Sequence, residues 1–463
     1  MVQPRSGCAS LSSVHALTLI DALYGQGRGY RRLDIRRRVA ANQRLSREAL
    51  TRINDEAFQH HVHRSIARFP WYAQRVQAYR GSLPAPGERV SPVEFPVWTR
   101  DDQRAFFAQQ SPPPESHYAR RTSGSTGQPV DFRVTRESYE WRTAVMNRAY
   151  SWAGAEECVK SVYVWGLDAH RESFSHRIKH ALHLLLQRRS YVDVFQKFSD
   201  AERAACCEMI NRVKPKAIVG YTGMLVDIAR YARDHKALTW KARSIVCAAE
   251  ELLPGQRELL ETHLAGEVFK SYGCREFMSI GMECERHAGY HIATDNLRVD
   301  VVDDTGQPVP EGKAGRIVIT DLHNAATPFV RYDVGDIGVM EPPGEACACG
   351  RPFPILKRVE GRVQDMIQTR EGPVTALYVT NIWKFDWVEG FQVVQHEVDR
   401  ILVRLLTSVE LTPERLAPVT AMLQHKLGDV TIDYERVDAL SRRPNGKVDM
   451  VVSSLTGEEP LPG

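Results

Sequence analysis

The sequence predicts an α/β fold: a large N-terminal domain with parallel, helix-covered sheets and an antiparallel β part, then a small α+β C-terminal domain. Short apolar runs alternate with segments of helical periodicity between residues 161 and 272, and such alternation is typical of a parallel sheet covered by helices. Strand-like runs separated by turn residues follow after Gly281, which indicates an antiparallel part. A further change of composition near residues 361–372 divides the chain into domains at 1–362 and 363–463.

The first hundred residues have a helical pattern. Ser46 is placed to cap a helix over residues 47–69, because a serine hydroxyl accepts a hydrogen bond from the first turn. Thr99 and Asp102 have capping-box spacing and open a second helix, which runs through residue 108.

The remaining elements are expected in the order that the apolar runs give. The four runs between residues 161 and 272 are short enough for strands, and the segments between them are long enough for helices. We expect parallel strands at 161–165, 217–219, 244–247 and 268–272, antiparallel strands at 297–302, 316–320 and 329–332, and, in the C-terminal domain, strands at 401–406 and 430–437 around a helix at 412–427.

The overall composition limits the classes of protein to be considered. A length of 463 residues argues for at least two domains. The formal net charge of +4 is small for this length and does not call for nucleic acid, and we interpret the arginine cluster at residues 28–38 as a solvated helix face rather than a site for an anionic partner. No stretch approaches the roughly 20 apolar residues of a membrane span. The nine cysteines fit a reduced compartment, so we expect a cytoplasmic protein without nucleic-acid or membrane partners.

One loop is unusually dense in glycine and hydroxyl side chains. Glycine lets backbone N–H groups wrap an anion, and hydroxyls add further donors, so nucleotide phosphates are the expected guest. A Walker loop is excluded because no lysine follows the loop, and by itself the run also fits a flexible linker. The loop joins probable strand edges and consists of Thr122, Ser123, Gly124, Ser125, Thr126 and Gly127.

Four downstream motifs give this loop a context. Residues 272–276 (Tyr-Gly-Cys-Arg-Glu) follow a strand, where the ligand groups of an open α/β sheet gather. The run 331–336 adds a carboxylate after a tight turn, Gly361-Arg362 stands at the domain boundary, and Lys447 lies in a turn near the C-terminus. Each motif alone also fits a turn or a surface charge. Turns and surface charges do not explain the order and spacing of the whole set.

The ordered series resembles the core motifs of the adenylate-forming superfamily of acyl-CoA synthetases and adenylation domains, and it looks most like the phenylacetate–CoA ligase group. The resemblance covers roughly residues 95–447. It implies a two-step reaction in which a carboxylate attacks the α-phosphorus of ATP, pyrophosphate leaves, and an acceptor such as the CoA thiol then displaces AMP.

The resemblance also implies the ATP-binding residues. The loop at 122–127 is expected to hold the β- and γ-phosphates, and Glu276 to hold Mg²⁺. Lys447 is expected to bridge the carboxylate oxygen and the α-phosphate, where charge builds in the transition state, until the mobile C-terminal domain rotates it away. The remaining positions are Ala249, Glu250, Tyr272 and Gly273 around the adenine, and Asp336 and Arg362 around the ribose.

The sequence departs from the family pattern near the Mg²⁺ position and in two other places. Arg275 stands where a serine or threonine commonly precedes the glutamate, and it is expected either to reach a phosphate or to form a structural ion pair. The loop ends in Gln128-Pro129 rather than Pro-Lys, and Gln364 occupies the hinge position.

A cysteine–histidine set suggests a structural zinc site. Cys347 and Cys349 resemble half of a metal knuckle, and Cys284 with His287 or His291 could complete it; three thiolates and one imidazole suit tetrahedral Zn²⁺. Some relatives in the resembling group bind zinc at similar places. The alternative is a set of unbound thiols in a turn.

The acid and its acceptor are the least constrained parts of the sequence prediction. By the resemblance, Trp165, Gly166 and Tyr221 border the acid, which suggests an aromatic acid, although both aromatic residues also fit a core. The acceptor is expected to be CoA, with a carrier-protein arm or an amine as the alternative. A non-catalytic nucleotide-binding homologue is a third reading, which the presence of Glu276 and Lys447 disfavours.

Overall fold

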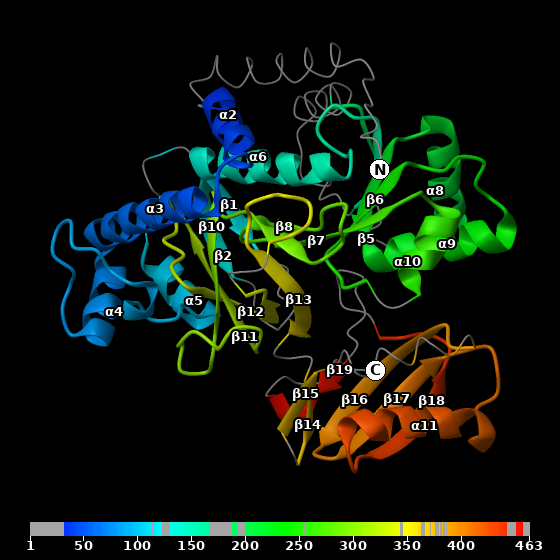
Figure 1. The fold of residues 1–463 in the computed structure, drawn as a ribbon. Helices are drawn as coiled ribbons and strands as arrows, with labels where there is room; N and C mark the ends of the chain where they lie inside the picture. Colours follow the sequence, from blue (N-terminus) through cyan, green and yellow to red (C-terminus); the bar gives the residue numbers. More distant parts are fainter. Residues whose placement is uncertain are drawn as a thin grey trace.

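The computed structural model has a large N-terminal domain and a smaller C-terminal domain beside it (Figure 1). The residues that it describes are 32–110, 112, 115, 117–122, 130–165, 187–192, 200–252, 255–342, 346–362, 366–370, 372–375, 379, 382, 385, 387–441 and 451–456. None of the described helices is long and apolar enough to cross a membrane.

The described residues before residue 110 are mainly helical, as the sequence predicted. The Ser46 side chain accepts a hydrogen bond from the amide of Ala49 and caps the second of these helices, and Thr99 and Asp102 form the expected capping box at the last. Both caps confirm the sequence prediction. The elements are α2 (Arg32–Asn42), α3 (Arg47–Arg68), α4 (Pro70–Arg80), the 3₁₀ turn η1 (Pro92–Glu94) and α5 (Arg100–Gln109).

One 11-stranded sheet runs through the N-terminal domain, in the order β10-β11-β12-β13-β9-β8-β7-β6-β5-β3-β4. Its parallel half confirms the four predicted strands, which pair in register with one another. The parallel strands are β3 (Ser161–Val164), β4 (Arg189–Val192), β5 (Ala217–Tyr221), β6 (Ser244–Ala248) and β7 (Val268–Cys274), and the helices around them are α6 (Arg136–Trp152), α8 (Asp200–Val213), α9 (Thr222–His235) and α10 (Gln256–His263).

The antiparallel half continues directly from β7 in the same sheet. The strand predicted at 329–332 is wrong for most of its length: the strand begins at Tyr332, because Arg331 has a left-handed backbone (φ 53°) that interrupts an extended chain. The strands are β8 (Met278–Met282), β9 (Tyr290–Ile292), β10 (Leu297–Val302), β11 (Ala314–Asp321), β12 (Tyr332–Met340) and β13 (Ile355–Arg362).

A separate hairpin carries the glycine-hydroxyl loop. Strand β1 (His117–Arg121) pairs antiparallel with β2 (Asp131–Thr135), so the loop joins two strand ends as predicted. Thr122 closes the hairpin, because its amide donates to the carbonyl of Val130 and its hydroxyl accepts from the Val130 amide, each at 2.9 Å. Residues 123–129 lie outside the described part of the chain.

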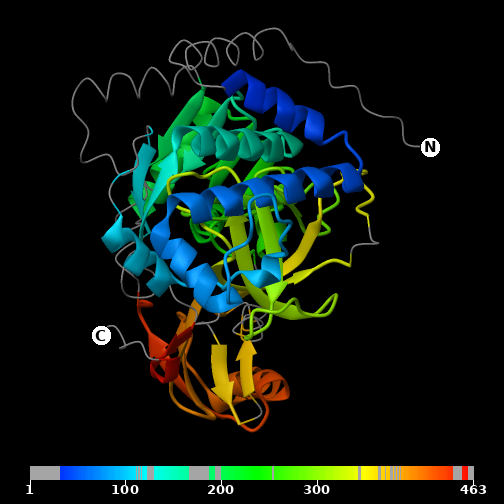
Figure 2. The ribbon, with the colours of Figure 1, turned by 90° about the vertical axis from the view of Figure 1, so that its left-hand side faces the viewer.

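The C-terminal domain has its own four-stranded sheet and its own apolar core, and Figure 2 shows it below the N-terminal domain. The predicted strands and helix are confirmed, and Arg230 of α9 donates to the carbonyl of Glu389 at 3.3 Å, which joins the two domains. The elements are β14 (Met366–Thr369), β15 (Gly372–Thr375), β16 (Gly390–Glu397), β17 (Arg400–Leu406), α11 (Pro413–Leu427), β18 (Thr431–Val437), β19 (Val451–Ser453) and the 3₁₀ turn η5 (Ser454–Thr456).

Candidate functional site

Two residues expected at the nucleoside meet directly in the structure. The Tyr272 hydroxyl, on β7, donates to Oδ2 of Asp336, on β12, at 2.7 Å. Burial and the nearby carboxylate raise the pKa of Tyr272 well above its usual value, so the phenol keeps its proton and remains a donor. Arg362 is the Cα partner of Asp336 across β12 and β13. The sheet therefore brings three predicted positions from distant parts of the chain to one corner.

Glu276, the expected Mg²⁺ ligand, is held from two directions. Its side chain is buried, and Oε1 accepts a hydrogen bond from the Tyr332 hydroxyl at 3.2 Å. Its backbone carbonyl accepts a hydrogen bond from Nη1 of Arg142. Arg275, next to it, is exposed, and no ion pair is recorded for it with another described residue; the alternative of a structural ion pair therefore has no support among the described residues.

The turn between β7 and β8 carries backbone strain. A Cβ atom on Gly273 would lie 1.9 Å from the carbonyl oxygen of Met278, so only glycine allows this close approach. Met278 itself has φ 62°, and Ala249 at the end of β6 has φ 69°. Left-handed backbone at such residues is costly and collects at functional sites. Gly273 and Ala249 belong to the motifs expected around adenine, and Met278 lies two residues after one of them.

Glu250 connects the end of β6 to the start of α9. Its carboxylate Oε2 accepts from the Gly223 amide at 2.8 Å, in the first turn of α9, where a negative charge complements the helix dipole. The Glu250 carbonyl accepts from the Thr222 hydroxyl at 2.9 Å. These bonds hold the segment that contains Ala249 against the start of α9.

The two aromatic residues expected to border the acid stack on each other. The rings of Trp165 and Tyr221 have a centroid distance of 4.4 Å and an interplanar angle of 29°. They lie at the ends of the neighbouring strands β3 and β5, both partly buried. The pair therefore offers one shared wall to a ligand rather than two sides of a slot.

Several predicted positions lie outside the described residues. These are Ser123, Gly124, Ser125, Thr126, Gly127, Gly166 and Lys447, and the side chain of Arg362. Their expected roles stay predictions.

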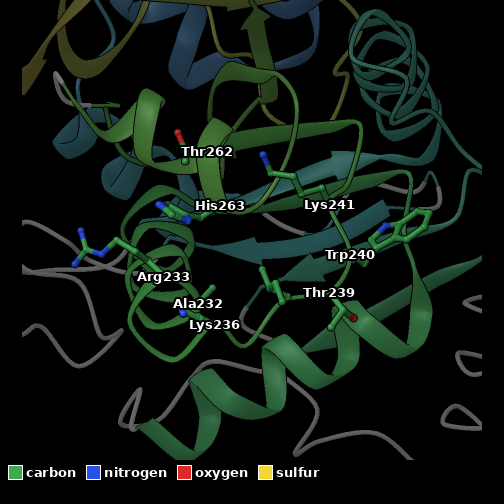
Figure 3. A pocket seen from close by; sticks show the side chains of 9 residues that line it. Ala232, Arg233, Lys236, Thr239, Trp240, Lys241, Thr262 and His263 are labelled. Carbon is green, nitrogen blue, oxygen red and sulfur yellow. The ribbon is translucent and has the colours of Figure 1, made fainter.

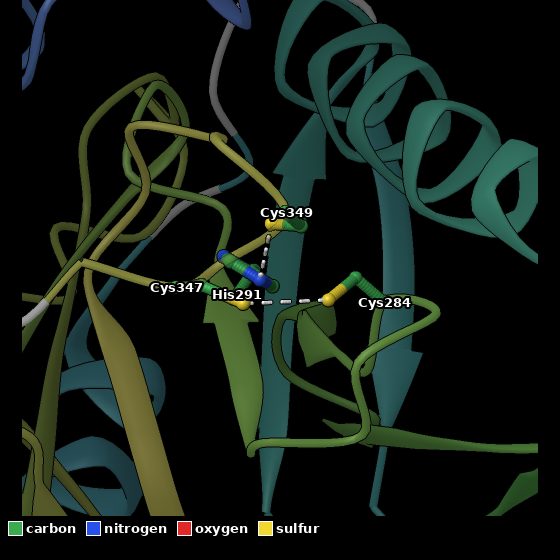
Figure 4. Close-up of side chains that lie close together, drawn as sticks. All are labelled: Cys284, His291, Cys347 and Cys349. Atoms are coloured by element: carbon green, nitrogen blue, oxygen red, sulfur yellow. Dashed lines mark hydrogen bonds between the residues drawn. The ribbon is translucent and has the colours of Figure 1, made fainter. Parts of the chain in front are cut away.

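The cysteine–histidine set forms a compact cluster (Figure 4). The ligand atoms of Cys284, His291, Cys347 and Cys349 all lie within 4.8 Å of one another. The Sγ atoms of Cys284 and Cys347 are 3.7 Å apart, and Cys349 Sγ is 3.4 Å from His291 Nε2. With Zn–S of about 2.3 Å and Zn–N of about 2.0–2.1 Å, a tetrahedron has edges of about 3.8 Å and 3.5 Å. The donor set and both edges fit a tetrahedral zinc ion.

The pKa of one member agrees with a ligand role. Burial lowers the pKa of His291 to about 4, so its imidazole is neutral and can offer a lone pair. Burial raises the pKa of Cys284 to about 12, so this thiol stays protonated until a cation offsets the charge of the thiolate.

His287, the other candidate histidine, lies apart from the thiols. Its Nδ1 is 3.1 Å from Glu283 and its Nε2 is 3.3 Å from Glu267. These hydrogen bonds, that to Glu283 above all, raise the pKa of His287. The structure thus groups His291, and not His287, with the three cysteines.

A surface hollow of about 450 Å³ lies elsewhere (Figure 3). It is lined by the end of α9 and the segment before β6, including Lys236 and Trp240. Tyr221 precedes the opposite end of α9, and a helix of 14 residues is about 20 Å long. The hollow is therefore separate from the candidate site.

Three residues around Glu276 were missed from the sequence. Tyr332 lies inside the 331–336 motif. It stands four residues before Asp336, and residues at this spacing on a strand lie on the same face, so the sequence could have indicated that Tyr332 faces the site. Arg142 and Asp321 have no local signal, because a charged residue on a helix or at a strand end is read as exposed.

A mixed sheet with one parallel half, the separate β1–β2 hairpin and a C-terminal domain with its own sheet define a two-domain α/β protein. The chain belongs to the AMP-binding enzyme family, whose sequence pattern matches residues 85–326, and the CapK C-terminal domain pattern matches residues 366–454. The resemblance to the adenylate-forming superfamily is thereby confirmed.

Curated relatives align over part of their length. A phenylacetate–coenzyme A ligase from Thermus thermophilus is 37% identical over 129 residues, 27% of this chain and 28% of the relative. Protein CapK from Staphylococcus aureus is 26% identical over 53% of this chain and 54% of its own, and a phenylacetate–coenzyme A ligase from Pseudomonas putida is 25% identical over 60% and 62%. The chain thus spans between about a quarter and three fifths of these relatives.

Solved structures share the fold. A 2-hydroxyisobutyryl-CoA ligase in the postadenylation state has a TM-score of 0.67 at 20% identity, over 87% of this chain and 88% of that one. The amide bond synthetase McbA from Marinactinospora thermotolerans has a TM-score of 0.52 at 16% identity, over 72% and 67%.

Proposed function

We propose that this protein activates a carboxylic acid as its acyl-adenylate and then transfers the acyl group to CoA. The observation that carries the proposal is a pair of contacts to β12, that of Tyr272 with Asp336 and that of Glu276 with Tyr332, in a chain of the AMP-binding enzyme family. In the first step a carboxylate oxygen bonds to the α-phosphorus and pyrophosphate leaves. In the second step the CoA sulfur bonds to the acyl carbon, AMP leaves, and the thiol proton passes to solvent.

The proposal gives a task to each of four site residues. The Asp336 carboxylate holds the ribose hydroxyls while the Tyr272 phenol orients it from one side, since a carboxylate has acceptor positions for more than one donor. Glu276 provides an oxygen ligand for Mg²⁺, which neutralises phosphate charge when it is bound. Lys447, by resemblance, stabilises the charge that develops at the α-phosphate.

Lys447→Ala tests this assignment. A contact made in the transition state lowers the rate more than it lowers ground-state affinity. We therefore expect ATP–pyrophosphate exchange to be lost while equilibrium ATP binding stays nearly intact. Exchange at the parent rate would refute the role of Lys447.

We propose that the acid is aromatic or otherwise planar and lies against the stacked pair of Trp165 and Tyr221. Offset stacking on an aromatic wall favours a flat ligand. ATP–pyrophosphate exchange over a panel of aromatic and aliphatic acids checks this, and a preference for small aliphatic acids would refute it. Exchange with no acid in the panel would instead favour a non-catalytic nucleotide-binding protein.

A second candidate replaces CoA by a carrier-protein arm or an amine. The fold shared with an amide bond synthetase favours including it. The two candidates differ in the second step only, so AMP release is followed with the preferred acid, with and without CoA. CoA-dependent AMP release and a thioester product support the first candidate, and CoA-independent release with an added amine supports the second.

We also propose that Cys284, His291, Cys347 and Cys349 hold a structural Zn²⁺. The four donors come from two segments, the β8–β9 connection together with β9 and the loop before β13, which the ion would tie together. A site with four protein ligands has no open position for substrate, so its role is in folding. Thiolate ligands need reduced cysteines, which is in keeping with a proposed cytoplasmic location.

A further inference from the structure

Arg142, on α6, is a charged residue in the interior of the large domain. Its side chain is 1% exposed and that of its partner Asp321 is 0% exposed, and the two are joined by Nη2 and Oδ2 at 2.5 Å. Nε of Arg142 donates to the Ser138 hydroxyl at 3.2 Å, and Nη1 donates to the backbone carbonyl of Glu276. One guanidinium thus connects α6, the end of β11 and the turn that carries Glu276.

The pair is not arranged to give the most stability. Burying two charges costs several kcal/mol of desolvation, and apolar residues of similar volume often give an equal or better free energy of folding. The second carboxylate oxygen of Asp321, Oδ1, is buried and has no hydrogen-bond partner among the described residues. An under-satisfied buried carboxylate needs an explanation other than packing.

The guanidinium of Arg142 donates to one backbone atom of the candidate site, the carbonyl oxygen of Glu276. Glu276 also accepts from the Tyr332 hydroxyl at its carboxylate, from the opposite end of the residue. Phe277, which follows Glu276, is fully buried in the core. The backbone of Glu276 is therefore held by Arg142 and its side chain by Tyr332, and the residue that follows it is held by the apolar core.

We propose that Arg142 is a positioning residue that fixes Glu276 for Mg²⁺ when the nucleotide binds. The inference rests on the proposed function of the Glu276 site. Asp321 holds the guanidinium in place, the guanidinium holds the Glu276 carbonyl, and the Tyr332 hydroxyl sets the direction of the carboxylate. A metal site works when its ligands are oriented by partners behind them, and loss of such a partner typically costs about 10–100-fold in metal affinity.

The same helix provides a matched control. Arg148 is also a buried arginine of α6, and it forms a two-pronged ion pair with the buried Asp295 at 2.6 and 2.9 Å. No hydrogen bond is recorded between Arg148 and Glu276 in the described part of the chain. Equal substitutions at the two arginines therefore disturb a buried ion pair of α6 with and without the contact to Glu276.

The experiment compares Arg142→Lys with Arg148→Lys in the full-length protein. Lysine keeps the charge beside the aspartate but lacks the planar fork, so it cannot serve Asp321, Ser138 and the Glu276 carbonyl together. ATP binding is measured by calorimetry in EDTA and at saturating Mg²⁺. The dissociation constant in EDTA divided by that with Mg²⁺ gives the factor by which Mg²⁺ strengthens ATP binding. We expect Arg142→Lys to lower this ratio roughly tenfold or more, with ATP affinity in EDTA near that of the parent, and Arg148→Lys to leave the ratio unchanged.

Three results would overturn the proposal. An equal ratio in the two variants makes Arg142 merely structural, and a parent protein whose ATP binding gains nothing from Mg²⁺ removes the role of Glu276. If Arg142→Lys does not fold, the double variant Arg142→Met with Asp321→Leu removes both charges together; an unchanged ratio there also refutes the inference. A parent that shows Mg²⁺-linked ATP binding but no exchange with any acid would instead refute the proposed function alone.

Discussion

Removal of one thiol from the cysteine–histidine cluster is expected to release the zinc and to lower the stability of the large domain. We expect the purified parent to contain one zinc per chain, since the Cys284–Cys347 and Cys349–His291 distances match two edges of a zinc tetrahedron within a few tenths of an ångström. Cys349→Ala leaves three donors in the cluster. We expect its zinc content to fall to a small fraction of an equivalent.

The size of the stability change follows from linkage. A ligand present at about 1,000 times its dissociation constant stabilises the native state by about 4 kcal/mol. A domain of roughly 150–250 residues loses about 2–4 °C of Tm per kcal/mol. The N-terminal domain is larger than this, so we use the smaller change of about 2 °C per kcal/mol. We therefore expect Tm to fall by about 8 °C.

Zinc is measured by mass spectrometry of the metal, and unfolding by calorimetry with and without a chelator. Cys207→Ala is the matched control, because it removes a buried thiol from α8, outside the cluster. The control is expected to keep its zinc and its response to the chelator. Less than half an equivalent of zinc in the parent, or equal zinc in Cys349→Ala and the parent, would refute the reasoning.

Three further predictions concern other parts of the structure. Asp336→Ala is expected to weaken ATP binding with little effect on the KM for the acid, and an ATP affinity equal to that of the parent contradicts the ribose role. Gly273→Ala is expected to cost at least about 3 kcal/mol of unfolding free energy in denaturant melts, because its Cβ would meet a carbonyl oxygen at 1.9 Å, whereas Gly266→Ala, with 3.3 Å available, is expected to cost less. The pKa of His287 is raised by hydrogen bonding to Glu283, so this stabilisation is fully present below the unfolded pKa of about 6.5 and is lost as pH rises through the folded pKa. We therefore expect His287→Gln to lower Tm more at pH 5.5 than at pH 8.5, and an equal loss at both would contradict the assignment.

Local patterns predicted most of the fold because they depend on neighbours in the chain. The cap at Ser46 and the capping box at Thr99 are made within one helical turn, so the sequence contains all the groups involved. The four parallel strands were found for a similar reason, since buried parallel strands are short continuous apolar runs. The strand expected at 329–332 failed because the left-handed Arg331 is set by contacts with residues far away in the sequence, namely the carbonyls of Phe95 and Gly306.

The candidate site was predicted in its motifs but not in its partners. The positions of Tyr272, Glu276 and Asp336 followed from ordered motifs and the resemblance they carry. The bond between Tyr272 and Asp336 joins residues 64 positions apart, and no local pattern contains both. The choice of His291 over His287 was likewise open, because both histidines stand within seven residues of Cys284 and only the course of β9 directs one of them to the thiols.

The sequence by itself determined the class of fold, the family, and the residue types that can bind a nucleotide and a metal ion, because periodicity, capping and motif order are properties of the chain. The tertiary structure alone decided which of those groups touch. It turned Glu250 toward the start of α9, stacked Trp165 on Tyr221, and set the buried Arg142 behind Glu276. Such contacts are decided by how strands and helices pack, since burial and distance across a sheet depend on elements that the chain brings together only when it folds.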